Sequence, residues 1–168
     1  MDSGTPLDAQ PGDAGILVFT SAAFAEGGKI PSVPYACANK TYGSGTSPPL
    51  AWAGAPAATQ SFALVMDDPT ASSWTHWVLF DIPAATISLA PGQTPSGAKL
   101  GAEQQGAQKY AGPCPPSGTH TYSLRLYALD VPSLGLNAGA TKAAVIAATA
   151  GHVLASAQLQ GTVAASDL

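Results

Sequence analysis

Three segments of this 168-residue chain alternate apolar and polar residues, and this pattern constrains the fold more than any other feature. They are residues 61–68, 74–82 and 120–130. Successive side chains of a β-strand point to opposite faces of a sheet, so each segment predicts a strand with one buried face. The chain is therefore expected to be mostly β.

Weaker signals complete the outline. Residues 16–20 form a short β-rich run, and residues 155–163 alternate again and predict a closing strand. An Ala-rich helix is predicted from Thr141, its N-cap, to about residue 156. Residues 83–118 are rich in Gly and Pro and predict a long excursion. Together these elements favour an antiparallel β-sandwich with Greek-key-like connections and a C-terminal helix.

Length and composition predict one domain, residues 15–168, after a loose polar leader at 1–14. Hydrophobic residues make up 46% and charged residues 10%, which excludes a disordered chain. The net charge is -4 and the lysines are scattered, which argues against a nucleic-acid partner. The apolar stretch 143–150 is too short to span a membrane.

The cellular location has two interpretations. No signal peptide follows Met1, so the protein is either cytoplasmic or a mature secreted form. The low Lys content and the abundance of Ala, Thr and Ser favour a periplasmic or secreted protein.

The two cysteines, Cys37 and Cys114, also have two interpretations. They are either two free, half-buried thiols or one bridge, and their spacing does not decide between them. A bridge closing so long a loop stabilises a fold by roughly 4 kcal/mol on the chain-entropy model.

Polar residues stand at the ends of the apolar strand faces. Asp68 ends the first face, His76 lies near the start of the second, and His120 and Tyr122 begin the third. The short, turn-like connection 69–75 suits an antiparallel pair, which sets the carboxylate and the first imidazole side by side. If the third strand runs away from the same sheet end, all four groups meet at one mouth of the core.

This group has a plain chemical use. Imidazole and phenol groups donate hydrogen bonds to phosphate or carboxylate oxygens. The glycines in residues 112–118 let backbone N–H groups approach a ligand, and Pro115 and Pro116 stiffen that wall. Asp68 repels an anion directly, so its expected task is to orient a histidine or to meet an ammonium group. Trp74 is expected at the rim.

Several sequence runs carry a resemblance to a known family. In chain order they are SPPLAWAG, DDPTA, WTHW, YAGPCPPSGTHTYSLRLYALD and GHVLASAQLQG. In these runs the chain resembles the bacterial branch of the phosphatidylethanolamine-binding, or Raf kinase inhibitor-like, family. The resemblance covers about residues 15–163.

The resemblance implies an anion pocket for phosphate, acetate or phosphoethanolamine-like groups. Its ligand-binding residues are then Asp68, Trp74, His76, Gly112, Cys114, Pro115, Pro116, His120 and Tyr122. The family's DPDxP element is altered here to Asp68-Pro69-Thr70-Ala71-Ser72, and the arginine of its HxRY element is replaced by Thr121. Both cysteines lie in segments typical of cysteine-bearing bacterial members, which favours a Cys37–Cys114 disulfide.

The leading hypothesis is a binding protein for a small anion or a phospholipid head group, not an enzyme, with no cofactor and no metal. The resemblance also implies a protein partner, a kinase or a serine protease, which this protein would inhibit through its surface loops. The alternative is an enzyme that uses Asp68, His76 and His120 as an acid/base set or as a metal triad.

Three further side chains are predicted to have structural and not ligand-binding roles. His152 is predicted inside the C-terminal helix as a hydrogen-bonded core residue. Asp67 and Asp81 fall on strand faces opposite the core and are predicted to be solvated.

Overall fold

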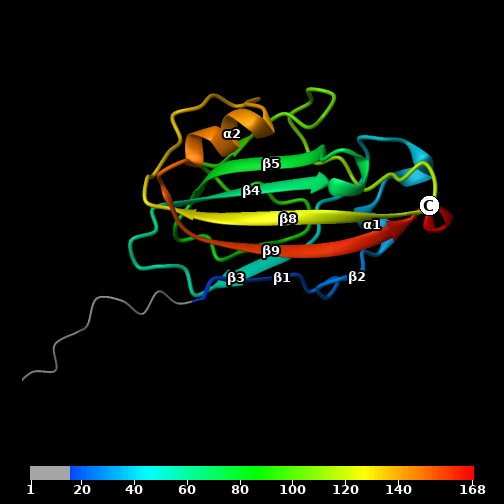
Figure 1. The fold of residues 1–168 in the computed structure, drawn as a ribbon, viewed down its shortest axis with the longest axis horizontal. Coiled ribbons are helices and arrows are strands. Elements are labelled where there is room, and N and C mark those ends of the chain that lie inside the picture. The colour runs from blue at the N-terminus through cyan, green and yellow to red at the C-terminus, as the bar shows by residue number, and fades with distance from the viewer. Residues whose placement is uncertain (1–15) are drawn as a thin grey trace, which may run out of the picture.

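The computed structural model describes residues 16–168, and the predicted leader 1–14 lies outside the described residues. The described residues form two sheets (Figure 1). The small sheet has the order β1-β3-β6, formed by Val18–Thr20, Leu50–Ala53 and Ser88–Leu89. The large sheet has the order β2-β9-β8-β4-β5-β7, formed by Gly28–Lys29, Val153–Ala164, Thr119–Leu129, Ser61–Asp68, Trp74–Pro83 and Lys99–Leu100.

The helical elements are short. The main helix, α2 (Lys142–Thr149), lies above β5 in Figure 1. The others are α1 (Ser32–Tyr35) and the 3-10 turns η1 (Ala38–Lys40), η2 (Pro69–Ala71) and η3 (Ala165–Asp167). The described part of the chain is thus mostly β, with two sheets and one main helix.

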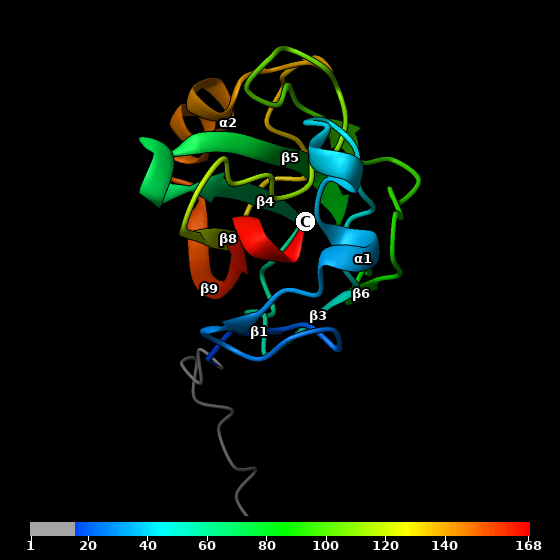
Figure 2. The ribbon, with the colours of Figure 1, turned by 90° about the vertical axis from the view of Figure 1, so that its right-hand side faces the viewer.

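The inner core lies between the two sheets, which Figure 2 shows from one end. Phe19 and Trp52 of the small sheet belong to the same buried cluster as Leu64, Leu124 and Leu126 of the large sheet. The leucines are the inward residues of β4 and β8, as their alternation predicts. Complete burial of each leucine stabilises the fold by about 2 kcal/mol.

A second cluster covers the opposite face of the large sheet. Val145 of α2 packs there against Val78 and Phe80 of β5 and Leu129 of β8. The large sheet is therefore apolar on both faces where α2 covers it, and alternation alone does not show which side of β5 faces inward.

Two irregularities in β5 overturn the predicted single face of residues 74–82. The register steps from Asp67↔Thr75 to Met66↔Trp77, which leaves His76 as an extra residue. A second shift follows between Leu79 and Ile82. Each bulge reverses the facing of the residues beyond it, so Val78 and Phe80 turn away from the inner core that Trp77 and Leu79 join.

The C-terminal helix is shorter than predicted. Thr141 is its N-cap and accepts a hydrogen bond from the Ala144 N–H at 3.2 Å, but the helix ends at Thr149. Gly151 has φ 80°, a left-handed conformation that ends a helix. His152 therefore lies in a turn, half-buried, with Nδ1 2.8 Å from Asp130, and the prediction of a core histidine within the helix is wrong.

The prediction that Asp67 and Asp81 face solvent is also wrong, because both are buried. Asp81 accepts hydrogen bonds from the Ser133 hydroxyl at 2.7 Å and the Leu134 N–H at 2.8 Å, and Lys99 lies 3.0 Å away. The face opposite the inner core is itself covered, by α2 and by the segment after β8.

The expected Gly/Pro excursion, residues 83–118, contains the short strands β6 and β7. Backbone hydrogen bonds join it to β5, from Gly101 to Val78 and from Ala111 to His76, both 2.9 Å long. This segment therefore builds walls around the end of β5.

Within residues 16–168, none of the helices combines the length and the apolar character needed to cross a lipid bilayer.

Candidate functional site

A cavity of about 340 Å³ opens where β4 ends and β5 and β8 begin. It is lined by Tyr42, Asp68, Ala71, Trp74, His76, Gln105, Cys114, Pro116, His120 and Tyr122. Seven of the nine predicted ligand-binding residues are among them. The antiparallel pairing of β4 with both β5 and β8 brings these segments to one end of the sheet.

Asp68 organises the floor of the cavity. It ends β4 and caps η2, so that one carboxylate oxygen accepts hydrogen bonds from the backbone N–H groups of Thr70 and Ala71, at 2.9 and 3.1 Å. The other oxygen lies 2.6 Å from His120 Nδ1. Because the carboxylate is buried and engaged by three donors, it orients His120.

His76 occupies the bulge of β5. Its Nδ1 lies 2.7 Å from the carbonyl oxygen of Ala111, which only accepts, so Nδ1 carries the proton. Burial lowers the pKa of His76, although the Ala111 carbonyl and the charge of Asp68 act in the opposite direction. The ring is therefore neutral at pH 7, and its Nε2 is a hydrogen-bond acceptor.

Tyr122 places a phenol between the two histidines. Its ring is edge-on to His76, with centroids 5.1 Å apart, and stacked on His120 at 6.5 Å. Burial raises the pKa of Tyr122, and the nearby Asp68 carboxylate raises it further. Tyr122 therefore keeps its proton and is available as a donor.

The rim contains residues that sequence reasoning missed. The Tyr42 hydroxyl accepts a hydrogen bond from Trp74 Nε1 at 2.8 Å and donates one to Glu103 at 2.7 Å. Glu103 is buried and also accepts from the N–H groups of Gln105 and Ala107. Burial alone would raise the pKa of Glu103, but these three hydrogen bonds outweigh it and lower the pKa.

No periodic pattern marks Tyr42 and Glu103, because both lie in loops. The only available signal was an aromatic residue, Tyr42, within a Gly- and Ser-rich segment.

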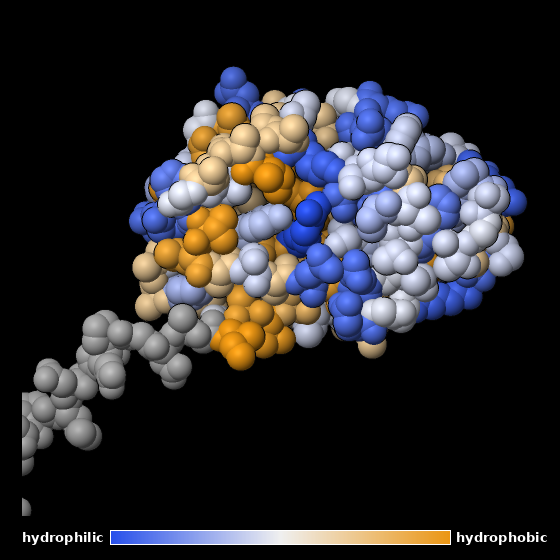
Figure 3. All heavy atoms as spheres, viewed as in Figure 1, coloured by the Kyte–Doolittle hydropathy of each residue, from blue (hydrophilic) through white to orange (hydrophobic). Residues whose placement is uncertain are grey.

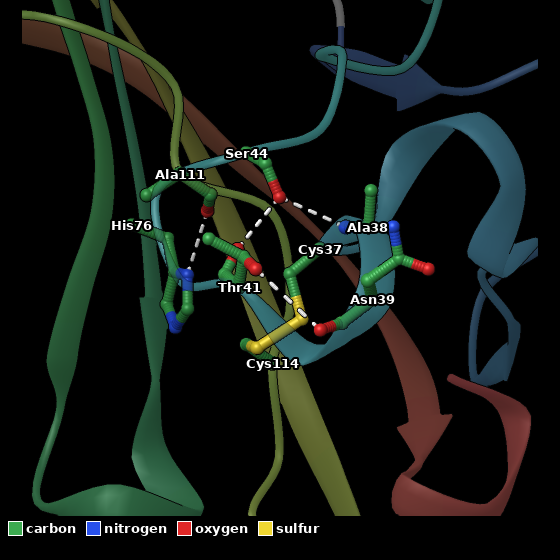
Figure 4. The surroundings of a disulfide bond; sticks show 8 residues. All are labelled: Cys37, Ala38, Asn39, Thr41, Ser44, His76, Ala111 and Cys114. Atoms are coloured by element: carbon green, nitrogen blue, oxygen red, sulfur yellow. Dashed lines mark hydrogen bonds between the residues drawn. A yellow bond between two sulfur atoms is a disulfide. The ribbon is translucent and has the colours of Figure 1, made fainter.

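A disulfide supports the far wall. Cys37 and Cys114 are bonded, with Cα atoms 5.3 Å apart, which confirms the pairing favoured by the resemblance. Figure 4 shows this bond joining the η1 segment to the loop that follows Ala111, whose carbonyl oxygen lies 2.7 Å from His76 Nδ1. The Cys37 N–H donates to the Pro113 carbonyl at 2.9 Å and reinforces the same junction.

Gly112 and Pro115 do not line the cavity. A Cβ on Gly112 would lie 2.8 Å from the carbonyl oxygen of Tyr35 and 2.7 Å from the carbonyl carbon of Ala36. The glycine thus allows two protein segments to meet, whereas sequence reasoning predicted that it admits a ligand. Pro115 is buried behind the wall.

Within the described residues, no three His, Cys, Asp or Glu side chains are grouped so as to hold a metal ion.

Comparison with known proteins gives the family. Residues 20–164 match the model of the phosphatidylethanolamine-binding protein family. A UPF0098 protein of Methanothermobacter thermautotrophicus is 47% identical over 146 residues, 83% of this chain and 93% of that protein. LppC of Mycobacterium tuberculosis, whose name describes it as a lipoprotein, is 39% identical over 166 residues, 96% of this chain and 77% of that protein.

Two solved structures share the fold. CT736 of Chlamydia trachomatis, a homologue of phosphatidylethanolamine-binding proteins by its title, is 33% identical with a TM-score of 0.79 over 89% of this chain and 97% of that one. Escherichia coli YbcL, described as a member of the mammalian family, is 27% identical with a TM-score of 0.78 over 88% and 98%. The family match, the sequence identities and the shared fold agree: the chain belongs to the phosphatidylethanolamine-binding protein family.

Proposed function

We propose that this protein binds a small oxyanion, a phosphate or a phospholipid head group, in the cavity between His76, His120 and Tyr122, without transforming it. The observation that carries the proposal is the convergence of two imidazoles and one phenol on a single cavity whose carboxylate is already engaged. A volume of about 340 Å³ suits a head group.

The hydrogen bonds within the site determine which side chains can donate to a ligand and which can accept from it. Nδ1 of His120 points to Asp68, so only its Nε2 is left for a ligand, and Nε2 donates only in the imidazolium form. Tyr122 donates as a neutral phenol. Neutral His76 accepts instead, which suits a phosphate oxygen that still carries a proton. We therefore expect affinity to rise as pH falls through the range in which imidazoles gain a proton.

Calorimetric titration with inorganic phosphate and with O-phosphoethanolamine tests the proposal. His76→Ala and His120→Gln should each weaken binding about tenfold, as expected for the loss of a hydrogen bond to a charged group. His152→Gln is the matched control, because its ring also pairs with a carboxylate, Asp130, but lies far along the sheet. Equal binding by wild type and both site variants would refute the proposal.

A catalytic function is the second candidate, and the short His120–Asp68 contact of 2.6 Å favours it. A carboxylate that orients an imidazole is a common arrangement for a general base. Hydrolysis assays with phosphate and carboxylate esters, with metal analysis of protein purified without chelator, test it. Turnover or a stoichiometric metal that Asp68→Ala abolishes would favour an enzyme over a binding protein.

We also propose that the protein acts outside the cytoplasm. The Cys37–Cys114 disulfide supports this, because such bonds persist in oxidising compartments, and so does the name of the LppC relative. Thiol alkylation of the native protein in cell fractions tests it, since free thiols at both positions would contradict the proposal. Modulation of a kinase or serine protease stays a prediction from the family resemblance.

A further inference from the structure

The outer face of β8 and β9 carries a second hollow, on the opposite side of the large sheet from the candidate cavity. It has a volume of about 240 Å³ and is lined by Arg125, Tyr127, Ser156, Ala157 and Gln158. Figure 3 looks onto this face and shows strongly hydrophilic atoms in a depression near its centre, over β8 and β9.

The hollow is built by two neighbouring cross-strand pairs. Arg125 lies opposite Gln158, and Tyr127 lies opposite Ser156, in the antiparallel register of β8 and β9. Leu124 and Leu126 of β8 point into the inner core. The side chains of these four residues therefore lie together on the opposite, outer face of the sheet. The packing of the inner core thereby places a guanidinium, a phenol, an amide and a hydroxyl around one depression.

The hydrogen-bonding groups of this hollow are largely unused by the protein. Among residues 16–168, the side chains of Tyr127, Ser156 and Gln158 form no hydrogen bond with another protein group, and Nε of Arg125 is buried without an acceptor. In the candidate cavity, by contrast, the carboxylates of Asp68 and Glu103 are already engaged by three donors each. The outer hollow therefore offers several donors to an incoming group.

The local charge is positive, although the chain as a whole carries -4. Arg125 and Lys142 both contact one carboxylate, that of buried Asp67, and Lys142 Nζ lies 2.8 Å from it. Two cations against one anion leave an excess of one positive charge. Lys29 and Lys99, by comparison, each pair with a separate carboxylate.

We propose that this hollow is a second ligand site, for a small oxyanion. A carboxylate or phosphate contacts the exposed edge of the Arg125 guanidinium, and Gln158, Ser156 and Tyr127 donate the remaining hydrogen bonds. The site is separate from the cavity of the proposed function and does not depend on it.

Nuclear magnetic resonance gives a direct test, because Arg125 is the only arginine in the sequence and its Nε–H produces a single signal. Inorganic phosphate and sodium acetate are titrated separately into ¹⁵N-labelled wild type and into His120→Gln, with sodium chloride at matched ionic strength as the reference. The Arg125 Nε–H and Gln158 side-chain amide signals should shift saturably in both proteins. The tighter of the two anions identifies the preferred oxyanion.

Substitutions at exposed positions then test the partners without disturbing the core. The double variant Ser156→Ala/Gln158→Ala should weaken the anion response at Arg125 about tenfold. Lys29→Gln is the control for a general loss of positive charge. Lys29 pairs with Asp167 away from the hollow, so this variant should leave the response unchanged. Retention of the response in the double variant would overturn the proposal.

Two further outcomes are decisive. A response to chloride equal to that to phosphate and acetate would show charge screening alone and would overturn the second site. Shifts confined to His120 and Tyr122 would also overturn it while leaving the proposed function intact, whereas shifts at Arg125 that persist in His120→Gln support it even if the cavity binds nothing.

Discussion

Asp67 and Asp68 are consecutive residues at the end of β4, yet they occupy opposite faces of the sheet and different environments. Asp67 faces outward and contacts two permanent cations, Arg125 and Lys142. Asp68 faces inward, caps η2 and orients His120 beside an open cavity. Both carboxylates are 3% exposed, so burial does not distinguish them.

The two carboxylates differ in the side chains that they contact. Arginine and lysine keep their charge throughout the physiological pH range, so the cluster around Asp67 is a permanent ion pair that ties α2 to β4 and β8. The partner of Asp68 is an imidazole, His120, whose other ring nitrogen is left for a ligand in the cavity. The cluster around Asp67 is thus expected to stabilise the fold, and the Asp68–His120 pair is expected to contribute to ligand binding in the cavity.

The largest expected effect comes from Asp67→Asn. Removing this carboxylate leaves two cations near the sheet without a counter-ion, and we expect the free energy of unfolding to fall by about 3 kcal/mol, the lower end for a buried pair because both cations are partly exposed. Urea denaturation measures the change. Phosphate affinity of the cavity should stay within a factor of about two.

Asp130→Asn is the matched control for that substitution. Its partner His152 and Asp130 itself are both more than two-fifths exposed, so this pair should contribute under about 1 kcal/mol. Equal losses of stability in the two variants would contradict the distinction between a structural and a surface carboxylate.

Asp68→Asn should show the reverse pattern. The asparagine oxygen still accepts from the N–H groups of Thr70 and Ala71, so we expect only about 1 kcal/mol of lost stability. Without a carboxylate, however, His120 loses the partner that fixes Nδ1–H and stabilises an imidazolium. Phosphate affinity measured by calorimetry should fall about tenfold. Tighter binding would show that Asp68 acts mainly by repelling anions.

The smallest expected effect is a pH dependence of stability caused by His76. Burial lowers the pKa of His76 in the folded state below its ordinary value of 6.5. Below pH 6.5 the unfolded chain binds a proton that the folded protein resists, so stability falls as pH decreases from there toward the folded pKa. The slope is at most about 1.4 kcal/mol per pH unit for one proton.

Urea denaturation of wild type and His76→Gln at pH 7.0, 6.0 and 5.5 isolates this contribution. The difference in unfolding free energy between the two proteins should shrink or change sign as pH falls, because the glutamine does not titrate. A constant difference across this range would contradict a lowered pKa. The stability lost in Asp67→Asn should be similar at all three pH values, since that variant keeps His76.

The local pattern predicts much of this protein. β4 spans the alternating residues predicted for it, and β8 begins one residue earlier than predicted. The placement of Asp68, His76, His120 and Tyr122 around one cavity follows from the parity of these strands and their antiparallel pairing. Alternation is a property of a few consecutive residues, which is why the sequence alone suffices for it.

Other features depend on what covers each surface. The bulge at His76 and the outward turn of Val78 and Phe80 were not predictable, because both faces of β5 are buried and apolar residues on either side fit equally well. The burial of Asp67 depends on Lys142 and Arg125, which approach from distant parts of the chain.

Alternation in the amino-acid sequence is enough to predict the main strands and the polar residues that end their inward faces. The loops that close the cavity could not be predicted in this way, with Tyr42 and Glu103 at its rim and Cys37 bonded to Cys114 behind it. The difference lies in the sequence separation of the residues that make the contacts. Strand alternation is set by the local geometry of the backbone, whereas contacts between loops depend on how the two sheets, α2 and the segments between them pack in three dimensions.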